Sequence, residues 1–372
     1  MKIESFKLER YFAEYEFSTK YLLSSSDCDG YSLEYILNCA DTNELKLWHE
    51  LKFGYTDSAG SLFLREAISA QYQNISENDV LVMSPGEANF ILMNVVLNEG
   101  DEVICTGPAY QSLYQIAKDL GCNIKFWYPA SGTTYFYDTS DLKRLITKRT
   151  KLLIINFPHN PTGFIPSESE LNEIINIARI NNILLFSDEM YHQLVHDRNS
   201  NIPSVCDLYE NSVSLWGMAK SFGLAGLRLG WIATKRHDLI EKIVSFKDYL
   251  TICNNAAGEV LSYIALKHKE KFIEPNIEKI VRNKHIFMNF VNHNSDLLEF
   301  SETKAGSTAL VKLKIHCSAY KYSEKLVKET GIMLVPSEMF EYGDKHVRIG
   351  FGRENFPEIL NVWQKLINDQ CY

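Results

Sequence analysis

Four short segments of this sequence place reactive or ligand-binding side chains beside glycine, proline or an apolar run. Residues 156–163 read Asn-Phe-Pro-His-Asn-Pro-Thr-Gly, and residues 188–191 read Asp-Glu-Met-Tyr. Residues 217–230 hold Lys220 in a glycine-flanked apolar context, and Arg348 lies inside an apolar strand-like run. The first three segments lie at or just after the ends of expected buried strands, where open α/β sheets bind their ligands. The sequence therefore predicts that these side chains meet at one ligand site.

Each segment also has a plainer interpretation. Asn-Pro and Thr-Gly pairs form turns, Asp188 could cap a helix, and Lys220 could be a solvated surface charge. A buried lysine would instead have a lowered pKa. Arginine within a strand is often paired structurally, but the guanidinium of Arg348 could equally bind a carboxylate through two hydrogen bonds.

The elements that must position these residues alternate between helix and strand. Apolar, strand-like runs are found at residues 102–105, 123–128, 151–157, 183–187, 212–216 and 229–233. Helical stretches are expected at residues 61–73, 86–97, 109–120, 141–147 and 168–180. This alternation predicts a mostly parallel sheet with helices on both faces. From residue 237 the pattern changes to two long helices, 237–268 and 275–294, followed by an α+β unit.

Composition limits the classes of partner. The chain has 372 residues, which favours two or three domains, and its net charge of −9 opposes binding to nucleic acid. Its apolar runs are too short for a membrane span, and the N-terminus lacks the apolar core of a secretion signal. We therefore expect a cytoplasmic protein without nucleic-acid or membrane partners. The eight cysteines are expected to be reduced, and no third ligand accompanies His192 and His196, so we expect no metal.

Taken together and in this order, the segments resemble the class I/II aminotransferases, which are fold-type I enzymes that use pyridoxal 5'-phosphate (PLP). The resemblance extends from Gly54 to Arg353. It implies an α/β, aspartate aminotransferase-like fold, in which a mostly parallel central sheet forms a large domain beside a smaller α+β domain. The implied large domain spans residues 45–270, and residues 1–44 and 271–372 form the small domain.

The resemblance also implies roles for individual residues. Lys220 would form a Schiff base with PLP and then act as the base at the substrate Cα. Asp188 would keep the pyridine nitrogen protonated, and Asn160 and Tyr191 would hydrogen-bond the ring oxygen. Arg348 would bind the substrate carboxylate, next to Asn160. Lys220, Asp188 and Tyr191 are thus the expected catalytic residues.

Further residues are expected around the ring and the phosphate of PLP. Tyr110 would stack on the ring, although it could also be a core aromatic residue. Arg228 would bind the phosphate, together with backbone N–H groups of Gly86, Glu87 and Ala88 at the start of a helix.

The segment at residues 54–60 is similar to the family segment whose tyrosine reaches the phosphate of the neighbouring subunit. Tyr55 therefore implies a homodimer, although it could also be a tyrosine buried in a turn.

Two positions depart from the family pattern. Gly217 stands three positions before Lys220, where a hydroxyl residue is usual, and Glu87 and Ala88 follow the loop glycine, where Ser, Thr or Ala is common. Two phosphate donors are therefore absent from the sequence, and we expect Glu87 to turn away from the dianion because like charges repel.

The resemblance implies that the enzyme moves the amino group of an L-amino acid to a 2-oxo acid. Residues 10–12, 23–26, 156–161 and 194–197 also resemble capreomycidine synthase, so a PLP-dependent lyase or cyclase is an alternative. A non-catalytic PLP-binding module is a third possibility.

Overall fold

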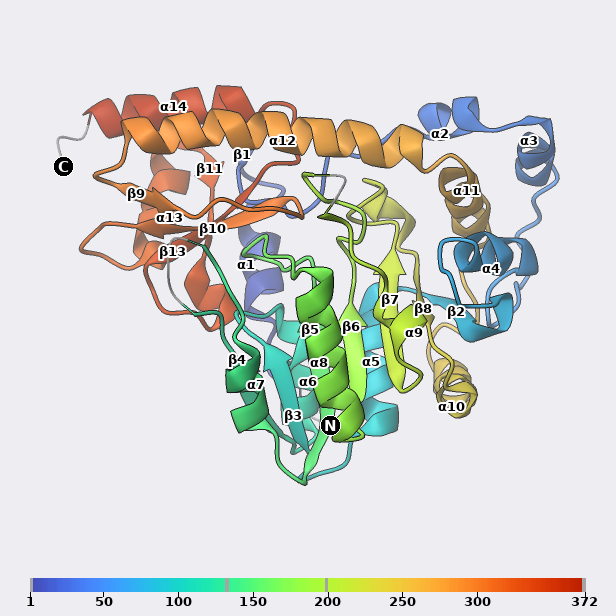
Figure 1. The fold of residues 1–372 in the computed structure, drawn as a ribbon. Helices are drawn as coiled ribbons and strands as arrows, with labels where there is room; N and C mark the ends of the chain where they lie inside the picture. Colours follow the sequence, from blue (N-terminus) through green and yellow to red (C-terminus); the bar gives the residue numbers. More distant parts are fainter. Residues whose placement is uncertain (1–2, 131–133, 198–199, 370–372) are drawn as a thin grey trace.

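The structure is a computed structural model that describes residues 3–130, 134–197 and 200–369. A seven-stranded sheet with the strand order β2-β8-β7-β6-β5-β3-β4 lies at its centre (Figure 1). Strand β8 runs antiparallel to both of its neighbours, and the other pairs are parallel. The strands are β2 (Val80–Met83), β3 (Glu102–Thr106), β4 (Asn123–Trp127), β5 (Thr150–Asn156), β6 (Leu184–Asp188), β7 (Ser212–Gly217) and β8 (Gly230–Ala233). The mostly parallel α/β sheet that the sequence predicts is therefore confirmed, whereas the edge strand β2 and the antiparallel direction of β8 were not predicted.

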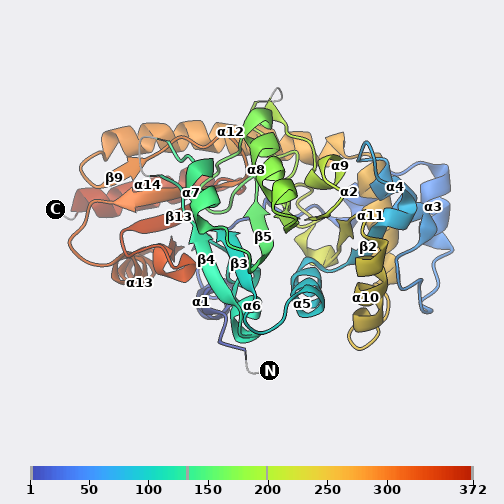
Figure 2. The same cartoon turned by 60° about the horizontal axis from the view of Figure 1, so that its bottom comes forward.

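Helices cover both faces of this sheet (Figures 1 and 2). On one face lie α5 (Pro85–Val96) and α6 (Gln115–Asp119), and on the other lie α7 (Thr139–Leu145), α8 (Glu168–Ile180) and α9 (Val205–Leu208). Strand β5 is buried on both sides: Leu152 and Ile154 join the core on the α5 side, and Leu153 and Ile155 join the core on the α8 side. Because both faces are covered, these strands are continuous apolar runs rather than alternating ones.

A second unit is built from the C-terminal third of the chain, shown in orange and red in Figure 1. Its antiparallel sheet has the order β12-β13-β10-β9. The long helix α12 crosses the top of the molecule in Figure 1 and packs against α14. The elements are α12 (Glu270–His293), β9 (Leu298–Phe300), β10 (Thr308–Leu313), α13 (Ala319–Thr330), β11 (Ile332–Met333), β12 (Val335–Pro336), β13 (His346–Gly350) and α14 (Phe356–Asp369).

The N-terminal segment contacts both parts of the molecule. Helix α1 (Lys7–Tyr15) buries Leu8 and Tyr11 against Met333 and Val335. Strand β1 (Tyr21–Leu22) pairs with β11 in parallel. Helices α2 (Leu33–Cys39) and α3 (Thr42–His49) pack instead against α11 (Ala256–Lys267), beside α4 (Leu62–Ser69).

Three helix predictions differ from the structure. The stretch 109–120 is a 3-10 turn at Gln111–Leu113 followed by α6, because Tyr114 leaves the helical conformation and its ring packs edge-on against Phe126. The stretch 237–268 is two helices, α10 (His237–Lys247) and α11, because the chain reverses at Ile252, whose φ is +63°. Helix α12 begins before Pro275, since the burial of Phe272 and Ile273 outweighs the lost backbone hydrogen bond.

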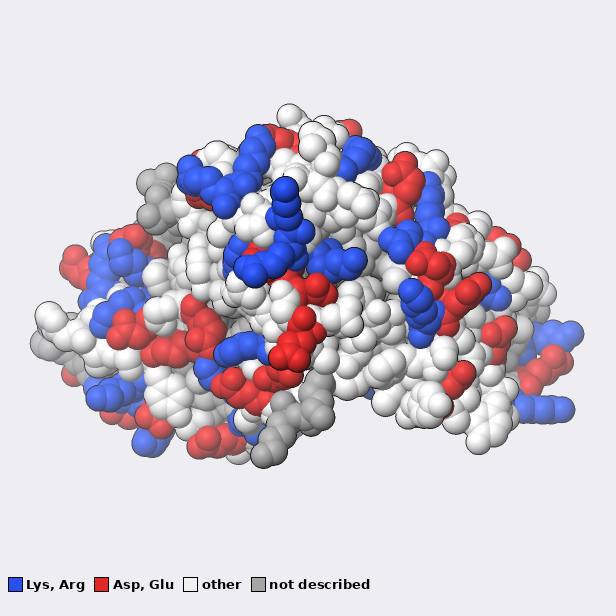
Figure 3. All heavy atoms as spheres, turned by 90° about the horizontal axis from the view of Figure 1, so that it is seen from below, with Lys and Arg blue, Asp and Glu red and all other residues white. Residues whose placement is uncertain are grey.

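Three further features are the state of the cysteines, the character of the helices and the distribution of surface charge. Seven cysteines are free, and the eighth, Cys371, lies outside the described residues. None of the helices in the described ranges combines the length and the apolar composition that a membrane span requires. On the face seen in Figure 3, basic and acidic side chains are interspersed.

Candidate active site

A cavity of about 400 Å³ lies beyond the carboxyl ends of β5, β6 and β7. It is the place at which an open, mostly parallel sheet is expected to bind its ligand. Eight of the eleven predicted site residues line it: Gly86, Tyr110, Asn160, Asp188, Tyr191, Lys220, Arg228 and Arg348. The other three, Tyr55, Glu87 and Ala88, are not among its lining residues.

Lys220 follows β7 and extends into the cavity toward the N-terminal segment. Its Nζ donates a hydrogen bond to Ser26 Oγ at 2.9 Å. The carbonyl of Ser26 accepts from the hydroxyl of Tyr191 at 3.2 Å and from Ser307 Oγ at 2.7 Å. The Lys220 amine is thus bonded to Ser26, whose carbonyl is held by Tyr191, shortly after β6, and by Ser307, just before β10.

Asn156, the last residue of β5, orients the loop that carries Asn160. Its side-chain nitrogen donates to the carbonyl of Asp188 at 2.9 Å, and its side-chain oxygen accepts from the backbone N–H of Asn160 at 2.9 Å. The amide therefore ties the loop after β5 to the end of β6. Sequence reasoning included Asn156 in the segment but assigned it no role.

Asp188 is a buried carboxylate at the end of β6. One oxygen accepts from the backbone N–H of Met190 at 3.1 Å. Burial raises its pKa from the usual 3.8 to about 6, although this hydrogen bond and the charge of Lys220 lower it. A buried carboxylate without a directly bonded cation is suited to hold a protonated ring nitrogen.

In the cofactor-free protein, Asp188→Asn is expected to raise the free energy of unfolding at pH 8 by up to about 3 kcal/mol. The raised pKa means that ionisation of Asp188 opposes folding. This penalty begins as the pH rises through the unfolded pKa, near 3.8, and is complete above the folded value, near 6. Urea unfolding at pH 5 and pH 8 measures the effect, which should be about half as large at pH 5. An equal effect at both pH values would contradict it.

Arg348 projects from β13 and is 1% exposed. Its Nε donates to the carbonyl of Ser24 at 3.1 Å, and its Nη1 donates to Asn160 Oδ1 at 3.3 Å. The rings of Phe12 and Phe340 flank the guanidinium, with centroids 5.8 and 5.4 Å away. Its Nη2 is buried and has no hydrogen-bond partner among the described residues. Because an unpaired buried donor is costly, this nitrogen is well suited to a ligand carboxylate.

Another part of the cavity lining is suited to an anion. Gly86 lies at the N-terminus of α5, where backbone N–H groups and the helix dipole favour a phosphate. Arg228 lines the same cavity and donates from Nη1 to the carbonyl of Ala225 at 3.0 Å. The carboxylate of Glu87 accepts from Thr251 Oγ1 at 2.7 Å, as expected for a side chain that turns away from the anion.

Packing accounts for the glycine at position 217. A Cβ there would lie 2.7 Å from the Cα of Gly230, its partner in the β7–β8 ladder. A serine or threonine at this position would force the two strands apart. The departure from the family pattern therefore follows from the close approach of the strands.

Tyr110 and the N-terminal helix complete the cavity. The hydroxyl of Tyr110 donates to Glu9 Oε1 at 2.6 Å, and its ring packs against Phe6 at 4.9 Å. Helix α1 and its C-terminal cap contribute Glu9, Phe12 and Glu16 to the lining, which sequence reasoning missed. The signal in the sequence was their spacing of three and four residues, which places them on one helix face.

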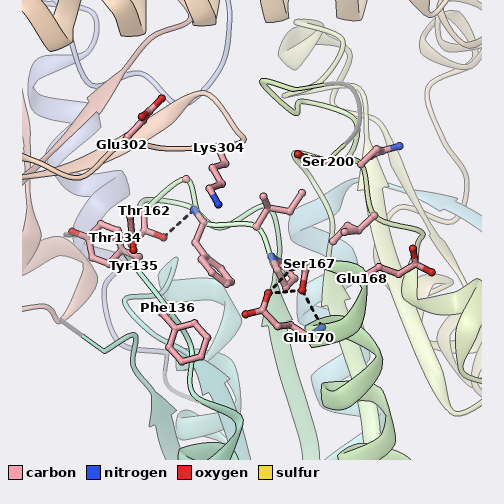
Figure 4. A pocket seen from close by; sticks show the side chains of 16 residues that line it. Thr134, Tyr135, Phe136, Thr162, Ser167, Glu168, Glu170, Ser200, Glu302 and Lys304 are labelled. Atoms are coloured by element: carbon pink, nitrogen blue, oxygen red, sulfur yellow. Dashed lines mark hydrogen bonds between the residues drawn. The ribbon is translucent and has the colours of Figure 1, made fainter. Parts of the chain in front are cut away.

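A second cavity of about 430 Å³ lies beside Thr162 and Gly163, at the end of the same loop (Figure 4). Its lining includes Ser167, Glu170 and Lys304. None of the predicted catalytic residues lines it. Ser167 and Glu170 are engaged with each other as the N-terminal cap of α8.

Comparison with known proteins is consistent with this geometry. Residues 18–360 match the family model described as aminotransferase class I and II. Capreomycidine synthase from Streptomyces vinaceus is 28% identical, over 92% of this chain and 88% of its own. Aromatic-amino-acid aminotransferase 2 from Thermococcus litoralis is 26% identical, over 85% of this chain and 84% of its own. The crystal structure of a PLP-dependent aminotransferase from Streptococcus suis superposes with a TM-score of 0.92 at 25% identity, covering 99% of both chains.

Proposed function

The chain belongs to the class I and II aminotransferases, a family whose cofactor is PLP, and on that premise we propose that it transfers the amino group of an L-amino acid to a 2-oxo acid. The observation that carries the proposal is the cavity itself. A lysine amine, a buried carboxylate and a buried, incompletely paired guanidinium surround one space of about 400 Å³.

The residues present fit PLP. Lys220 Nζ would be the amine for its aldehyde carbon, and Asp188 would be the partner for its ring nitrogen. Gly86 and Arg228 are placed for its phosphate. When bound, PLP supplies a conjugated ring that accepts the electron pair left at the substrate Cα.

Each side chain then has one task. Lys220 takes the proton from the substrate Cα, and its flexible stem lets the same amine deliver a proton to a neighbouring carbon. Asp188 holds the positive charge on the ring nitrogen. Arg348 binds the substrate carboxylate through Nη2, which fixes the direction of the Cα–H bond relative to Lys220. Asn160 and Tyr191 would hydrogen-bond the ring oxygen, and Tyr110 would cover the ring.

We further propose that the active unit is a homodimer. Tyr55 is 89% exposed, and Phe53 and Tyr249 are 84% and 89% exposed. The loops that carry them adjoin, since Ser58 Oγ donates to the carbonyl of Ile252 at 2.7 Å. Exposed apolar side chains gathered in this way mark a surface that a partner covers. A second copy of the chain would bring Tyr55 to the neighbouring phosphate.

A PLP-dependent lyase or cyclase is the second candidate, because the relative with 28% identity is a capreomycidine synthase. Both reactions begin with removal of the Cα proton by Lys220. They differ in whether Lys220 would then return the proton to a neighbouring carbon or a leaving group would depart from the substrate side chain.

Enzyme mixed with a reactive amino acid, but no 2-oxo acid, is expected to stop after one equivalent of product. Transamination leaves the amino group on the cofactor, so a second turnover needs an acceptor. Absorbance of the cofactor and the amount of 2-oxo acid formed measure this outcome. Added 2-oxo acid should restore the original spectrum. Sustained turnover without any acceptor would reject transamination in favour of the lyase or cyclase.

A further inference from the structure

One wall of the cavity carries carboxylates that the proposed reaction does not use. Glu9, Phe12 and Glu16 lie three and four residues apart, on the face of α1 and its C-terminal cap that lines the cavity. Asp27 is a third carboxylate on the same wall. The reaction as proposed requires one carboxylate, Asp188, and leaves these three without a task.

Two of the three carboxylates lack a bonded cation. Asp27 is paired with Arg353, whose Nη2 lies 3.1 Å from its oxygen. Among the residues that the structure describes, the carboxylate of Glu9 accepts only from the neutral hydroxyl of Tyr110. The backbone N–H of Glu16 donates to the carbonyl of Phe12 at 2.8 Å, but its carboxylate makes no hydrogen bond or salt bridge with any described residue. Burial, followed by the charges of Asp27 and Glu9, raises the pKa of Glu16, although the charges of Arg353 and Lys220 lower it. The wall is therefore acidic and open to a positive charge.

The cations that line the cavity already have partners in the proposed reaction. They are Lys220, Arg228 and Arg348 among the described residues, and they serve the cofactor aldehyde, its phosphate and the substrate carboxylate. The unpartnered, buried Nη2 of Arg348 indicates that a ligand carboxylate binds next to α1, since the Phe12 ring of this helix lies 5.8 Å from the guanidinium. Glu9 and Glu16 would repel a substrate whose side chain carries a second carboxylate. They would attract a substrate whose side chain is positively charged.

We propose that the substrate is an L-amino acid with a cationic side chain, either a guanidinium or an ammonium group. Arg348 binds its α-carboxylate, and Glu9 and Glu16 bind the side-chain charge. This inference rests on the proposed function, because it uses the same cavity and the same carboxylate site. Glu9 and Glu16 determine specificity and take no part in proton transfer.

The test compares amino acids of matched shape on the holoenzyme. Arginine and citrulline have nearly the same shape but differ in charge, and ornithine and lysine carry an ammonium group instead. Stopped-flow absorbance of the cofactor gives an apparent Kd and a rate for each. Arginine or ornithine is expected to bind at least about 10-fold more tightly than citrulline. Glutamate is expected to bind more weakly than the cationic amino acid and than citrulline. Comparison of the apparent Kd values for arginine and ornithine shows whether the site prefers a guanidinium or an ammonium group.

Two variants test the residues themselves. Glu16→Gln and Glu9→Gln should each reduce the preference for the cationic amino acid over citrulline, measured as a ratio within each protein, by about 10-fold. Glu14→Gln is the matched control, since Glu14 lies on the same helix, is exposed and does not line the cavity. It should leave the preference unchanged.

The outcomes separate this inference from the proposed function. If neutral amino acids react as well as cationic ones, or if both glutamine variants keep the wild-type preference, the substrate class is wrong although the aminotransferase stands. If no amino acid of any class changes the cofactor absorbance, the proposed function fails, and the substrate class fails with it.

Discussion

Replacing Lys220 with alanine is expected to reduce amino-acid turnover by about 10⁴-fold or more, because one amine both anchors the cofactor and moves the proton. The amine is the only lysine Nζ among the described residues that line the cavity. Borohydride reduction of the wild-type holoenzyme should leave a pyridoxyl group on the peptide that contains Lys220. The Lys220→Ala protein should carry no such group.

Lys242→Ala is the matched control, since Lys242 is an exposed lysine of α10. It should retain full activity and the label on Lys220. Lys247, by contrast, is fully buried and donates to the carbonyls of Ser58 and Val82, so its amine is already engaged. A pyridoxyl group on Lys247 or any other lysine, or on none after PLP is supplied, would refute the assignment of Lys220.

The placement of the central site residues could be predicted because they lie close to strand ends. Asn160, Asp188 and Lys220 lie at or shortly after the ends of β5, β6 and β7. The carboxyl ends of neighbouring parallel strands lie side by side, so residues far apart in sequence meet there. The buried strands themselves are recognisable as continuous apolar runs.

The wall formed by α1 could not be predicted in the same way. Helix α1 has nine residues, of which only Leu8 and Tyr11 are buried. Its position depends on partners remote in sequence, such as the hydrogen bond from the hydroxyl of Tyr11 to the carbonyl of Leu334 at 2.8 Å. Local periodicity contains no information on such contacts. The residues that determine the proposed substrate class, Glu9 and Glu16, were therefore missed.

The point at which a helix is interrupted also could not be predicted from the sequence pattern. Residues 237–268 have continuous helical periodicity, yet the chain turns back at residues 248–255. The turn lets the carbonyl of Ile252 accept from Ser58, and the carbonyl of Asn254 accept from Thr56. These tertiary hydrogen bonds, which hold the loop of Tyr55, outweigh the local preference for helix.

Arg348→Ala is expected to lower kcat/KM for the amino-acid substrate by about 10²-fold or more. Truncation removes the guanidinium whose Nη2 would bind the carboxylate, and loss of one partner of a buried charged pair costs about 2–5 kcal/mol. Arg348→Lys keeps a charge but cannot form two parallel hydrogen bonds, so it should recover only part of the loss. Steady-state kinetics of the three proteins measures the effect.

A comparison with the decarboxylated amine separates carboxylate binding from packing. Arg348 also packs between Phe12 and Phe340, so its removal could disturb the cavity without any role in binding. If Arg348 binds the carboxylate, the wild-type preference for the amino acid over the amine should shrink by about 10²-fold in Arg348→Ala. If Arg348 only packs, both substrates should lose equally and the preference should persist. Because the ratio is measured within one protein, a general loss of stability cancels from it, and only a lost interaction with the carboxylate changes it.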